Sequence, residues 1–520
     1  MSAAPQTAAP SGRKKAIGHQ SLPICDPAKS PAALGHESQN TSSPEGAKVG
    51  GIVALGELSE ARISQDGPSG HGEFTYVDIS SIDRQTKRIV DPKVLVVGQA
   101  PSRARQVLKG GDVLVSMTRP NLNAVALVPP DLDGAIGSTG FHVLRPKDAE
   151  PGFLYYAVQT TDFIDAMCQK VQGALYPAVR PKDISSFCIL PSSLPQQRRI
   201  VAEIEKQFTR LEAGVAALRR VQANLKRYRA AVLKAACEGK LVPIEAELAD
   251  VGRVPPRGVR PTAKNAASGD AAYNAAPYET GEQLLQRILT ERRQNWQGRG
   301  QYKEPAAPDT ASLPPLPDGW TWARLEQLGV TFGGLTKNPK RAKLPKQLPY
   351  LRVANVYANE LRLQEIEHIG VEDSELEKLL VRAGDLLIVE GNGSKAQIGR
   401  LAMWDGSIDP CVHQNHIIKV RPVEARMPKW ILHWLQSPIG RHFVELVASS
   451  TSGLYTLSVN KVGDLPVALP PLAEQTRIVA EVERRLSVVE ELESVMSANL
   501  QRTTRLRQSI LQKAFTGELH

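Results

Sequence analysis

The stretch RRIVAEIEKQF (Arg198 to Phe208) occurs a second time, slightly altered, as TRIVAEVERRL (Thr476 to Leu486). The two copies stay in register without a gap to a shared ending, VLKAACEGKL (Val232 to Leu241) and ILQKAFTGEL (Ile510 to Leu519). A spacing this large is not that of a solenoid, whose repeats are a few tens of residues long. The pattern indicates one module used twice, with a long helix closing each copy.

Apolar residues step by three and four through both long helical segments. The first series comprises Ile204, Phe208, Leu211, Val215, Leu218, Val221, Leu225, Tyr228 and Val232, and the second comprises Val482, Leu486, Val489, Leu492, Met496, Leu500, Leu506 and Ile510. Such a narrow seam is typical of a coiled coil, and about 40 residues at ~1.5 Å each predict a rod of roughly 60 Å. Two copies packed about a pseudo-two-fold axis would be antiparallel, with a globule at either end. The alternative is two ordinary amphipathic helices, each packed on its own domain.

The globular parts are duplicated as well, since short β-like runs broken by Gly and Pro occur in the same order in both halves. GDVLVSM (Gly111 to Met117) is matched by GDLLIVEG (Gly384 to Gly391). The helical pattern at Phe153 to Gln169 is matched by one at Trp430 to Val447. We therefore expect an α+β fold: two globular domains of mixed or antiparallel β-sheet with helices, separated by an antiparallel two-helix coiled coil in a pseudo-two-fold internal repeat.

These patterns divide the chain into six segments. We expect a flexible tail over 1–48, a first globule over 49–194, a first long helix over 195–241, a linker over 242–312 with a short helix at 278–296, a second globule over 313–472 and a second long helix over 473–520. The tail and much of the linker are rich in Ala, Pro, Ser and Gly, so they lack the apolar groups needed to form a core.

Composition narrows the class of protein. The net charge of +10 favours a polyanionic partner, either nucleic acid or an acidic protein surface. Five cysteines with no CxxC pair argue against a disulfide scaffold and a zinc cluster, and favour a reducing cytoplasm. No apolar run approaches the roughly 20 residues that span a bilayer, and the N-terminus lacks the apolar core of a secretory signal. We expect a soluble cytoplasmic protein that does not bind membranes.

Several motifs together resemble one known family. LPPLAEQTRIVAEVE (Leu469 to Glu483), the weaker LPSSLPQQRRIVAEIE (Leu190 to Glu205) and the endings EGKL and TGEL resemble the specificity subunit of type I restriction-modification systems. The resemblance covers nearly all of the chain outside the tail and the linker. It implies two target recognition domains held apart by a coiled coil, each reading one half of a split, asymmetric site in double-stranded DNA.

The resemblance also implies that the chain has no catalytic activity of its own. It would dock two methyltransferase subunits to form an adenine methylase, and two motor-nuclease subunits to form the restriction enzyme. S-adenosylmethionine, ATP and Mg would then bind to those partners, and no cofactor to this chain. The sequence agrees, because it has no GxxxxGK[ST] loop, no N/D-P-P-Y/F tetrapeptide and no PD pair followed by ExK.

One cluster of metal-ligating residue types is present, CVHQNH (Cys411 to His416). It offers three possible zinc ligands with no fourth nearby, so we expect a buried or DNA-facing polar turn and no metal.

If the globules read DNA, loop side chains must reach base edges while Lys and Arg hold phosphates. The candidates in the second globule are Thr336, Lys337, Asn338, Lys340, Arg341, Asn392, Ser394, Lys395, Gln397, Arg400, His413, Gln414, Asn415, Ser452 and Tyr455. The alternative for GNGSKAQIGR (Gly391 to Arg400) is a simple Asn-Gly hairpin turn.

The matched candidates in the first globule are Ser116, Thr118, Arg119, Asn121, Ser138, Thr139, Gln172, Tyr176 and Arg180. The two globules share their strands and differ in these loops, as reading two different half-sites requires.

The ends of the long helices carry small and apolar residues. By the resemblance we assign these to contact with the methyltransferase: Ala236, Gly239, Leu241, Ala514, Phe515, Gly517 and Leu519. The first long helix also has a basic face, made of Arg219, Arg220, Lys226, Arg227 and Arg229. That face is either solvated, or follows DNA phosphates, or meets an acidic partner.

Two other hypotheses remain open on sequence. One is a coiled-coil scaffold that binds proteins rather than DNA, and the other is a detached specificity module of a fused restriction-methylation enzyme. Steep weakening of sequence-selective binding by salt would separate DNA reading from the scaffold hypothesis.

Overall fold

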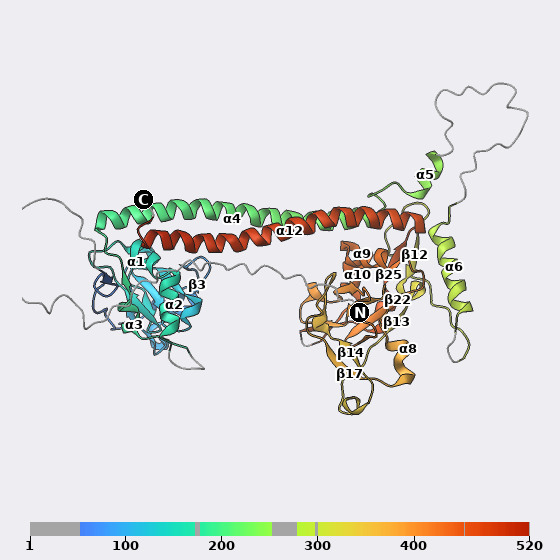
Figure 1. Ribbon diagram of the computed structural model, residues 1–520, viewed down its shortest axis with the longest axis horizontal. Coiled ribbons are helices and arrows are strands. Elements are labelled where there is room, and N and C mark those ends of the chain that lie inside the picture. Colours follow the sequence, from blue (N-terminus) through green and yellow to red (C-terminus); the bar gives the residue numbers. More distant parts are fainter. Residues whose placement is uncertain (1–51, 172–176, 252–277, 297–299, 452, 519–520) are drawn as a thin grey trace, which may run out of the picture. The chain divides into compact units, whose positions relative to one another are not determined.

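A computed structural model describes residues 52–171, 177–251, 278–296, 300–451 and 453–518 (Figure 1). The tail expected over 1–48 and a large part of the expected linker lie outside these ranges. The chain forms two compact units, unit 1 from residues 1–219 and 497–520 and unit 2 from residues 220–496. Within the described ranges, no helix combines the length and the apolar character needed to cross a membrane.

Two long helices, α4 (Leu194–Cys237) and α12 (Leu472–Phe515), each contribute to both units. In unit 1, one core contains residues from the start of α4 and the end of α12, namely Val201, Ile204, Phe208, Ile510, Leu511, Ala514 and Phe515. In unit 2, another core contains residues from the end of α4 and the start of α12, namely Val232, Leu233, Ala236, Cys237, Ile478, Val479, Val482 and Leu486. The helices are therefore antiparallel within each unit, and the alternative of a helix packed only on its own globule is wrong.

Ion pairs join the two helices within each unit. In unit 1 the Arg507 guanidinium lies 3.4 Å from the Glu212 carboxylate and 4.0 Å from the centre of the Phe208 ring. In unit 2 Arg229 pairs with Glu493 at 3.3 Å and with Glu490 at 3.7 Å. Arg229, one of the basic-face residues, therefore neutralises acidic groups of the neighbouring helix.

Both long helices end at a glycine in the left-handed conformation. Gly239 has φ +66° and Gly517 has φ +81°. The amide of Lys240 donates to the carbonyl of Ala235 at 2.8 Å, and that of Glu518 to Lys513 at 2.9 Å. These are the six-to-one hydrogen bonds of a Schellman motif, in which glycine adopts positive φ without strain. The EGKL and TGEL endings therefore encode helix termination.

The described residues of unit 1 form two sheets and two short strand pairs. The four-stranded sheet has the order β5-β2-β9-β6 and consists of β5 (Lys93–Val96), β2 (Glu73–Val77), β9 (Ile136–Ser138) and β6 (Ala104–Val107). The three-stranded sheet has the order β10-β7-β8 and consists of β10 (Phe141–Leu144), β7 (Val113–Ser116) and β8 (Val125–Leu127). The short pairs are β1 (Val53–Ala54) with β11 (Cys188–Ile189), and β3 (Ile82–Asp83) with β4 (Arg88–Ile89). The helices are α1 (Pro151–Ala157), α2 (Thr161–Gln169) and α3 (Pro181–Ser185).

Unit 2 repeats this plan with additional strands. One sheet has the order β13-β22-β18-β20 and consists of β13 (Gly329–Phe332), β22 (Ile417–Pro422), β18 (Leu386–Val389) and β20 (Leu401–Met403). A second has the order β17-β14-β21, from β17 (Glu367–Gly370), β14 (Gln347–Leu351) and β21 (Val412–His413). A third has the order β19-β24-β23, from β19 (Gly391–Asn392), β24 (Leu454–Thr456) and β23 (Ser449–Thr451). The short pairs are β12 (Thr321–Arg324) with β25 (Pro466–Leu469), and β15 (Val356–Tyr357) with β16 (Glu360–Leu361).

The shorter helices of unit 2 are α5 (Glu245–Val251), α6 (Gly281–Gln294), α7 (Leu325–Leu328), α8 (Leu376–Leu379), α9 (Pro428–Gln436), α10 (Pro438–Val447) and α11 (Val459–Gly463). The two helical patterns expected to be single helices are each broken, into α1 and α2 in unit 1 and into α9 and α10 in unit 2. Thr160 and Ser437 cap the second helix of each pair with a side-chain oxygen. A hydroxyl that accepts from a backbone N–H competes with helix continuation, which explains both breaks.

An ion pair on a buried aspartate occurs at the same place in both repeats. Arg145 donates Nε and Nη2 to the two carboxylate oxygens of Asp112, at 2.9 and 2.8 Å. Arg421 does the same to Asp385, at 2.7 and 2.6 Å. Each Asp follows a glycine with φ +90° at the start of the matched GDVLVSM and GDLLIVEG strands. Because two fixed hydrogen bonds hold each pair, it joins β7 to β10 and β18 to β22 in the same geometry.

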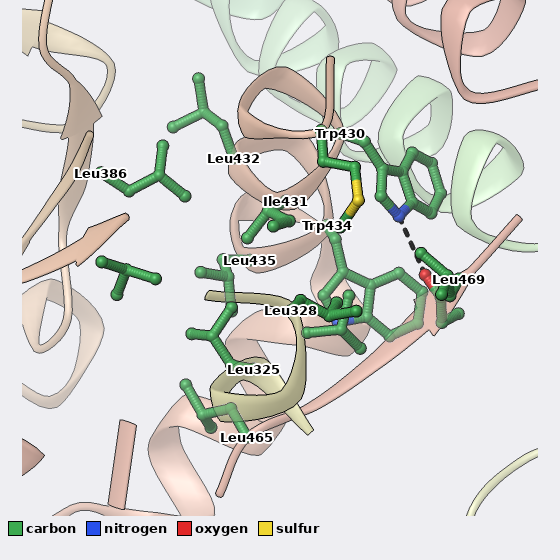
Figure 2. Close-up of a cluster of buried hydrophobic side chains, with 14 of the residues drawn as sticks. Leu325, Leu328, Leu386, Trp430, Ile431, Leu432, Trp434, Leu435, Leu465 and Leu469 are labelled. Carbon is green, nitrogen blue, oxygen red and sulfur yellow. Dashed lines mark hydrogen bonds between the residues drawn. The ribbon is translucent and has the colours of Figure 1, made fainter. Parts of the chain in front are cut away.

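The core of unit 2 is built around tryptophans (Figure 2). Trp430 on α9 donates Nε1–H to the Ala468 carbonyl at 2.9 Å, and its ring meets that of Trp320 edge-on at 5.5 Å between centres. Helix α6 buries one face in the same core, through Leu284, Leu285, Ile288 and Leu289. The short helix expected at 278–296 is therefore an integral part of unit 2.

A lysine lies inside the sheet of unit 2. Lys419 on β22 is fully buried, and its ammonium donates to the carbonyls of Lys378 and Leu380 at 2.6 and 2.8 Å. Burial, together with the positive charge of the nearby Arg421, lowers the pKa of Lys419 to about 7. The ammonium thus holds the end of α8 at the cost of a desolvated charge.

We predict that Gly517, at the end of α12, and Gly214, inside α4, respond oppositely to the same substitution. Gly517→Ala should lower the free energy of unfolding by about 1 kcal/mol, because alanine is strained at positive φ. Gly214→Ala, at an exposed position inside α4 with nothing within 4 Å of an added Cβ, should raise it by about 0.5–1 kcal/mol. Urea unfolding of both variants beside the parent chain checks the pair; stabilisation by Gly517→Ala contradicts the capping role.

We also predict that Lys419 makes stability depend on pH. Between about pH 7 and pH 10.5 the unfolded lysine keeps a proton that the folded one releases, so the free energy of unfolding rises with pH, by up to about 1.4 kcal/mol per unit. Lys419→Met should reduce this slope. Lys87, whose pKa burial lowers to about 8, acts in the same direction in unit 1 and leaves a residual slope. Unfolding measured from pH 7.5 to 9.5 is the check, and equal slopes for variant and parent refute the prediction.

Candidate nucleic-acid interface

Three loops meet at one point of unit 1. The amide of Met117, just after β7, donates to the carbonyl of Gly140 at 3.0 Å. The carbonyl of Met117 accepts from the amide of Val179 at 2.9 Å. Two residues after Met117, the amide of Arg119 donates to the carbonyl of Pro177 at 2.8 Å. The loops that carry the candidates of unit 1 are thus joined by backbone hydrogen bonds into a three-loop junction.

The same junction exists in unit 2. The amide of Glu390, just after β18, donates to the carbonyl of His416 at 2.9 Å, and its carbonyl accepts from the amide of Leu457 at 2.8 Å. Two residues after Glu390, Asn392 on β19 pairs with Tyr455 on β24. The sheet register gives the same correspondence, since the parallel pairing of Tyr76 with Ile136 matches that of Tyr350 with Val412. Met117, Gly140 and Val179 therefore correspond to Glu390, His416 and Leu457.

A fourth loop of unit 2 joins this junction. The amide of Leu335 donates to the carbonyl of His413 at 2.8 Å, and the amide of Asn415 donates to the carbonyl of Leu335 at 3.0 Å. Residues 336–340, which follow Leu335, are all exposed. Unit 2 therefore gathers all four of its candidate loops, with exposed basic and amide groups beside the junction.

Comparison with known proteins gives a consistent result. No protein-family model matches the chain. It is 31% identical over 191 residues to the type I restriction enzyme EcoKI specificity subunit of Escherichia coli (strain K12), covering 36% of this chain and 40% of that subunit. It is 21% identical over 389 residues to the EcoDI specificity subunit of Escherichia coli, covering 73% of this chain and 72% of that subunit.

A solved structure extends the likeness to nearly the full chain. It comes from a description of complex assembly and conformational transition of the type I R-M system, is 27% identical, and aligns with a TM-score of 0.60 over 92% of this chain and 100% of that chain. The chain resembles type I restriction specificity subunits. The resemblance predicted from the repeated motifs is therefore confirmed, although the EcoKI match spans only about two fifths of that relative's length.

Some candidate side chains of unit 2 have structural partners. Arg341 donates two hydrogen bonds to Glu375, at 2.9 and 2.8 Å, and Arg400 donates to the Val353 carbonyl at 2.9 Å. His413 is fully buried with Nδ1 3.0 Å from the Ile417 carbonyl oxygen, and burial lowers its pKa to about 4. These three side chains hold the loops in place and do not face solvent as free groups.

Other candidates of unit 2 face solvent. They are Thr336, Lys337, Asn338, Lys340, Ser394, Lys395 and Gln397. Asn392, Gln414, Asn415 and Tyr455 are half-buried. Lys337 lies 2.8 Å from the half-buried carboxylate of Glu367, and Gln414 accepts from the amide of Val353 at 3.2 Å.

The Asn-Gly segment is not a two-residue hairpin turn. Residues 390–400 connect β18 to β20, and within them β19 leaves the hairpin to pair with β24. The connection also contains the short helix η10 (Lys395–Gln397). A long loop carrying its own strand presents Ser394, Lys395 and Gln397 beyond the sheet.

The candidates of unit 1 divide in the same way. Thr118, Arg119 and Asn121 are exposed, and Thr139 is half-buried. Ser116 and Ser138 are buried and bond locally, Ser116 to the Thr118 carbonyl and Ser138 to the Gly140 amide. Arg180 is exposed and pairs with Asp183 at 3.3 Å. The candidates Gln172, Tyr176 and Ser452, and Leu519 of the expected docking set, lie outside the described residues.

The apolar helix ends have an explanation within the chain. Ala236 is buried in the core of unit 2, and Ala514 and Phe515 are buried in that of unit 1. Gly239 and Gly517 terminate the helices. Core packing and capping therefore account for these residues within the chain, and half-buried Leu241 also packs against the core of unit 2. Their assignment to partner docking stays a prediction.

The CVHQNH turn does not gather metal ligands. The two ends of the turn differ in exposure to solvent. Cys411 is buried, which raises the pKa of its thiol to about 12, while His416 is exposed. Across the described ranges no group of three or more His, Cys, Asp or Glu side chains is placed to hold a metal ion.

Glu390 and His416 are polar junction residues that were not among the DNA-contact candidates, although His416 belongs to the CVHQNH cluster. The imidazole Nδ1 lies 2.9 Å from the Glu390 carboxylate, and both side chains reach solvent. His416 directly follows the three candidates His413 to Asn415. Its position beside Glu390 comes from the fold, in which the Glu390 amide donates to the His416 carbonyl.

We predict that Arg341 and its neighbour Lys340 differ in their effect on stability. Arg341→Met should lower the free energy of unfolding by about 2 kcal/mol, because it leaves Glu375 without its bidentate partner. Lys340→Met, at an exposed side chain, should change it by less than about 0.5 kcal/mol. Chemical denaturation of the two variants provides the measurement, and equal effects would show that the Arg341–Glu375 pair does not hold the loop.

Proposed function

We propose that this chain is the DNA-specificity subunit of a type I restriction-modification complex, and that each unit reads one half of a split, asymmetric site in double-stranded DNA. The observation that carries this is the duplicated three-loop junction. Its backbone is the same in both units, whereas the side chains on it differ. A reader of two different half-sites needs one scaffold that holds two unlike sets of base-contacting groups.

The charge of the chain supports DNA as the partner. The net charge is +10, and exposed cations such as Arg119 in unit 1 and Lys340 and Lys395 in unit 2 lie in the loops beside the junctions. Cations at loop tips hold phosphates and set the register in which neighbouring groups meet base edges. The scaffold alternative gives no reason for basic loops around a duplicated junction.

The long helices suit a spacer between two readers. Each begins in one unit and ends in the core of the other, so helix length would fix the separation of the half-sites. We propose that α4 and α12 form an antiparallel coiled coil about a pseudo-two-fold axis, with the two recognition domains held apart along it. A bipartite site with a constant nonspecific spacer is the expected consequence.

We further propose that catalysis belongs to partner subunits. Two methyltransferase subunits would bring S-adenosylmethionine, and two motor-nuclease subunits would bring ATP and Mg. An exposed apolar stripe on α12 is formed at helical spacing by Val488, Val495 and Leu492. The sequence assigned Leu492 to the seam, but its side chain is exposed, and the stripe suits a methyltransferase contact better than the buried helix ends do.

The test is to co-express the chain with its methyltransferase and read adenine methylation across the genome. We expect methylation at one motif made of two unlike parts with a fixed spacer, and none when the chain is omitted. Leu492→Glu, in the exposed stripe, should reduce methylation at least tenfold without unfolding the chain, because it places a charge in an apolar contact. The matched control is Glu491→Gln, beside the stripe. A single uninterrupted motif, or no motif, would contradict the proposal.

A further inference from the structure

We propose that Glu390 and His416 form a base-reading pair of unit 2, in which the carboxylate orients the imidazole so that Nε2 accepts a hydrogen bond from the exocyclic amine of an adenine or a cytosine. This deepens the proposed function, on which it rests, by naming a specificity-determining side chain and the group it reads.

The pair is held by two contacts that reinforce each other. The backbone amide of Glu390 donates to the carbonyl of His416 at 2.9 Å, and the side chains meet at 2.9 Å between Nδ1 and the carboxylate. The imidazole side chain is 57% exposed and that of Glu390 30%. The carboxylate therefore holds the ring at Nδ1, while the rest of the ring is accessible to solvent. Preorganisation of this kind lowers the entropy lost when a side chain binds its ligand.

In the neutral ring, the direction of this hydrogen bond determines what Nε2 can read. A carboxylate only accepts, so Nδ1 must be the donor. A neutral imidazole that donates from Nδ1 presents an unprotonated Nε2, which is an acceptor. In the major groove the donors are the N6 amine of adenine and the N4 amine of cytosine.

Comparison within the chain places this pair where the two units differ. The corresponding residues of unit 1 are Met117, whose thioether is only a weak acceptor, and Gly140, which has no side chain. The neighbouring His413 cannot take the same role, because it is fully buried with Nδ1 against the Ile417 carbonyl. His416 is thus the histidine of the junction that is both oriented and accessible.

The experiment uses the complex of the chain with its methyltransferase and compares methylated motifs. His416→Ala should relax one base position in one half-site, with discrimination there falling about tenfold, and should leave the other half-site unchanged. Glu390→Gln should relax the same position by a smaller factor, because an amide accepts or donates and so allows both imidazole tautomers. His442→Ala, at an exposed histidine on α10, is the matched control and should leave the motif unchanged.

The outcomes separate this inference from the proposed function. If the parent complex methylates a bipartite motif and folded His416→Ala retains that motif unaltered, or changes the other half-site, the inference is overturned. If the parent complex methylates no bipartite motif, the proposed function itself fails. Thermal unfolding of each variant identifies loss of folding. If His416→Ala does not fold, Glu390→Gln provides the test, because it keeps the size and hydrogen-bonding reach of the side chain. A folded Glu390→Gln variant with an unaltered motif would then overturn the inference.

Discussion

The reciprocal burial of helix ends is the constraint on which both units depend. Leu511, Ala514 and Phe515 at the end of α12 fill the core of unit 1, where the Phe515 ring lies 4.9 Å from that of Phe153. The end of α4 fills the core of unit 2 beside the tryptophans. Burial of one such leucine or phenylalanine side chain stabilises a fold by roughly 1.5–3 kcal/mol. Neither core is complete without residues from the far end of a helix that begins in the other unit, so the two units are linked thermodynamically as well as covalently.

The duplication separates what must be rigid from what is free to vary. The Arg145–Asp112 and Arg421–Asp385 pairs, the glycines before each Asp and the junction hydrogen bonds have the same geometry in both repeats. These groups are buried or made of backbone, so changing them costs stability. The side chains that project from the junctions cost little to change, and they are the ones that differ. Under the proposed function, such a protein would acquire a new specificity by altering loops while its scaffold stays intact.

The sequence predicted features that depend on local pattern. The repeated helices, the paired strands and the apolar stripe of α6 all follow from periodicity, and the resemblance follows from motifs at fixed spacing. It did not predict features that depend on partners far away in the chain. Arg341 and Arg400 look like free cations until the fold brings Glu375 and the Val353 carbonyl to them. His413 looks like a loop residue, but it belongs to β21 and is fully buried. The polar groups of Glu390 and His416 meet only through the fold. The helix endings resembled a docking surface because a Schellman glycine and a buried alanine leave the same small-residue signature as a contact patch.

The core of unit 1 also imposes an order on synthesis. Its strands and the first turns of α4 leave the ribosome early, but the residues from Ile510 to Phe515 that complete the core are made only after all of unit 2. At 5–20 residues per second the interval is roughly 15 to 60 s. During that time the apolar surface that Leu511 and Phe515 will cover remains open to water, to chaperones or to another chain. The first unit to be translated is therefore the last to be finished.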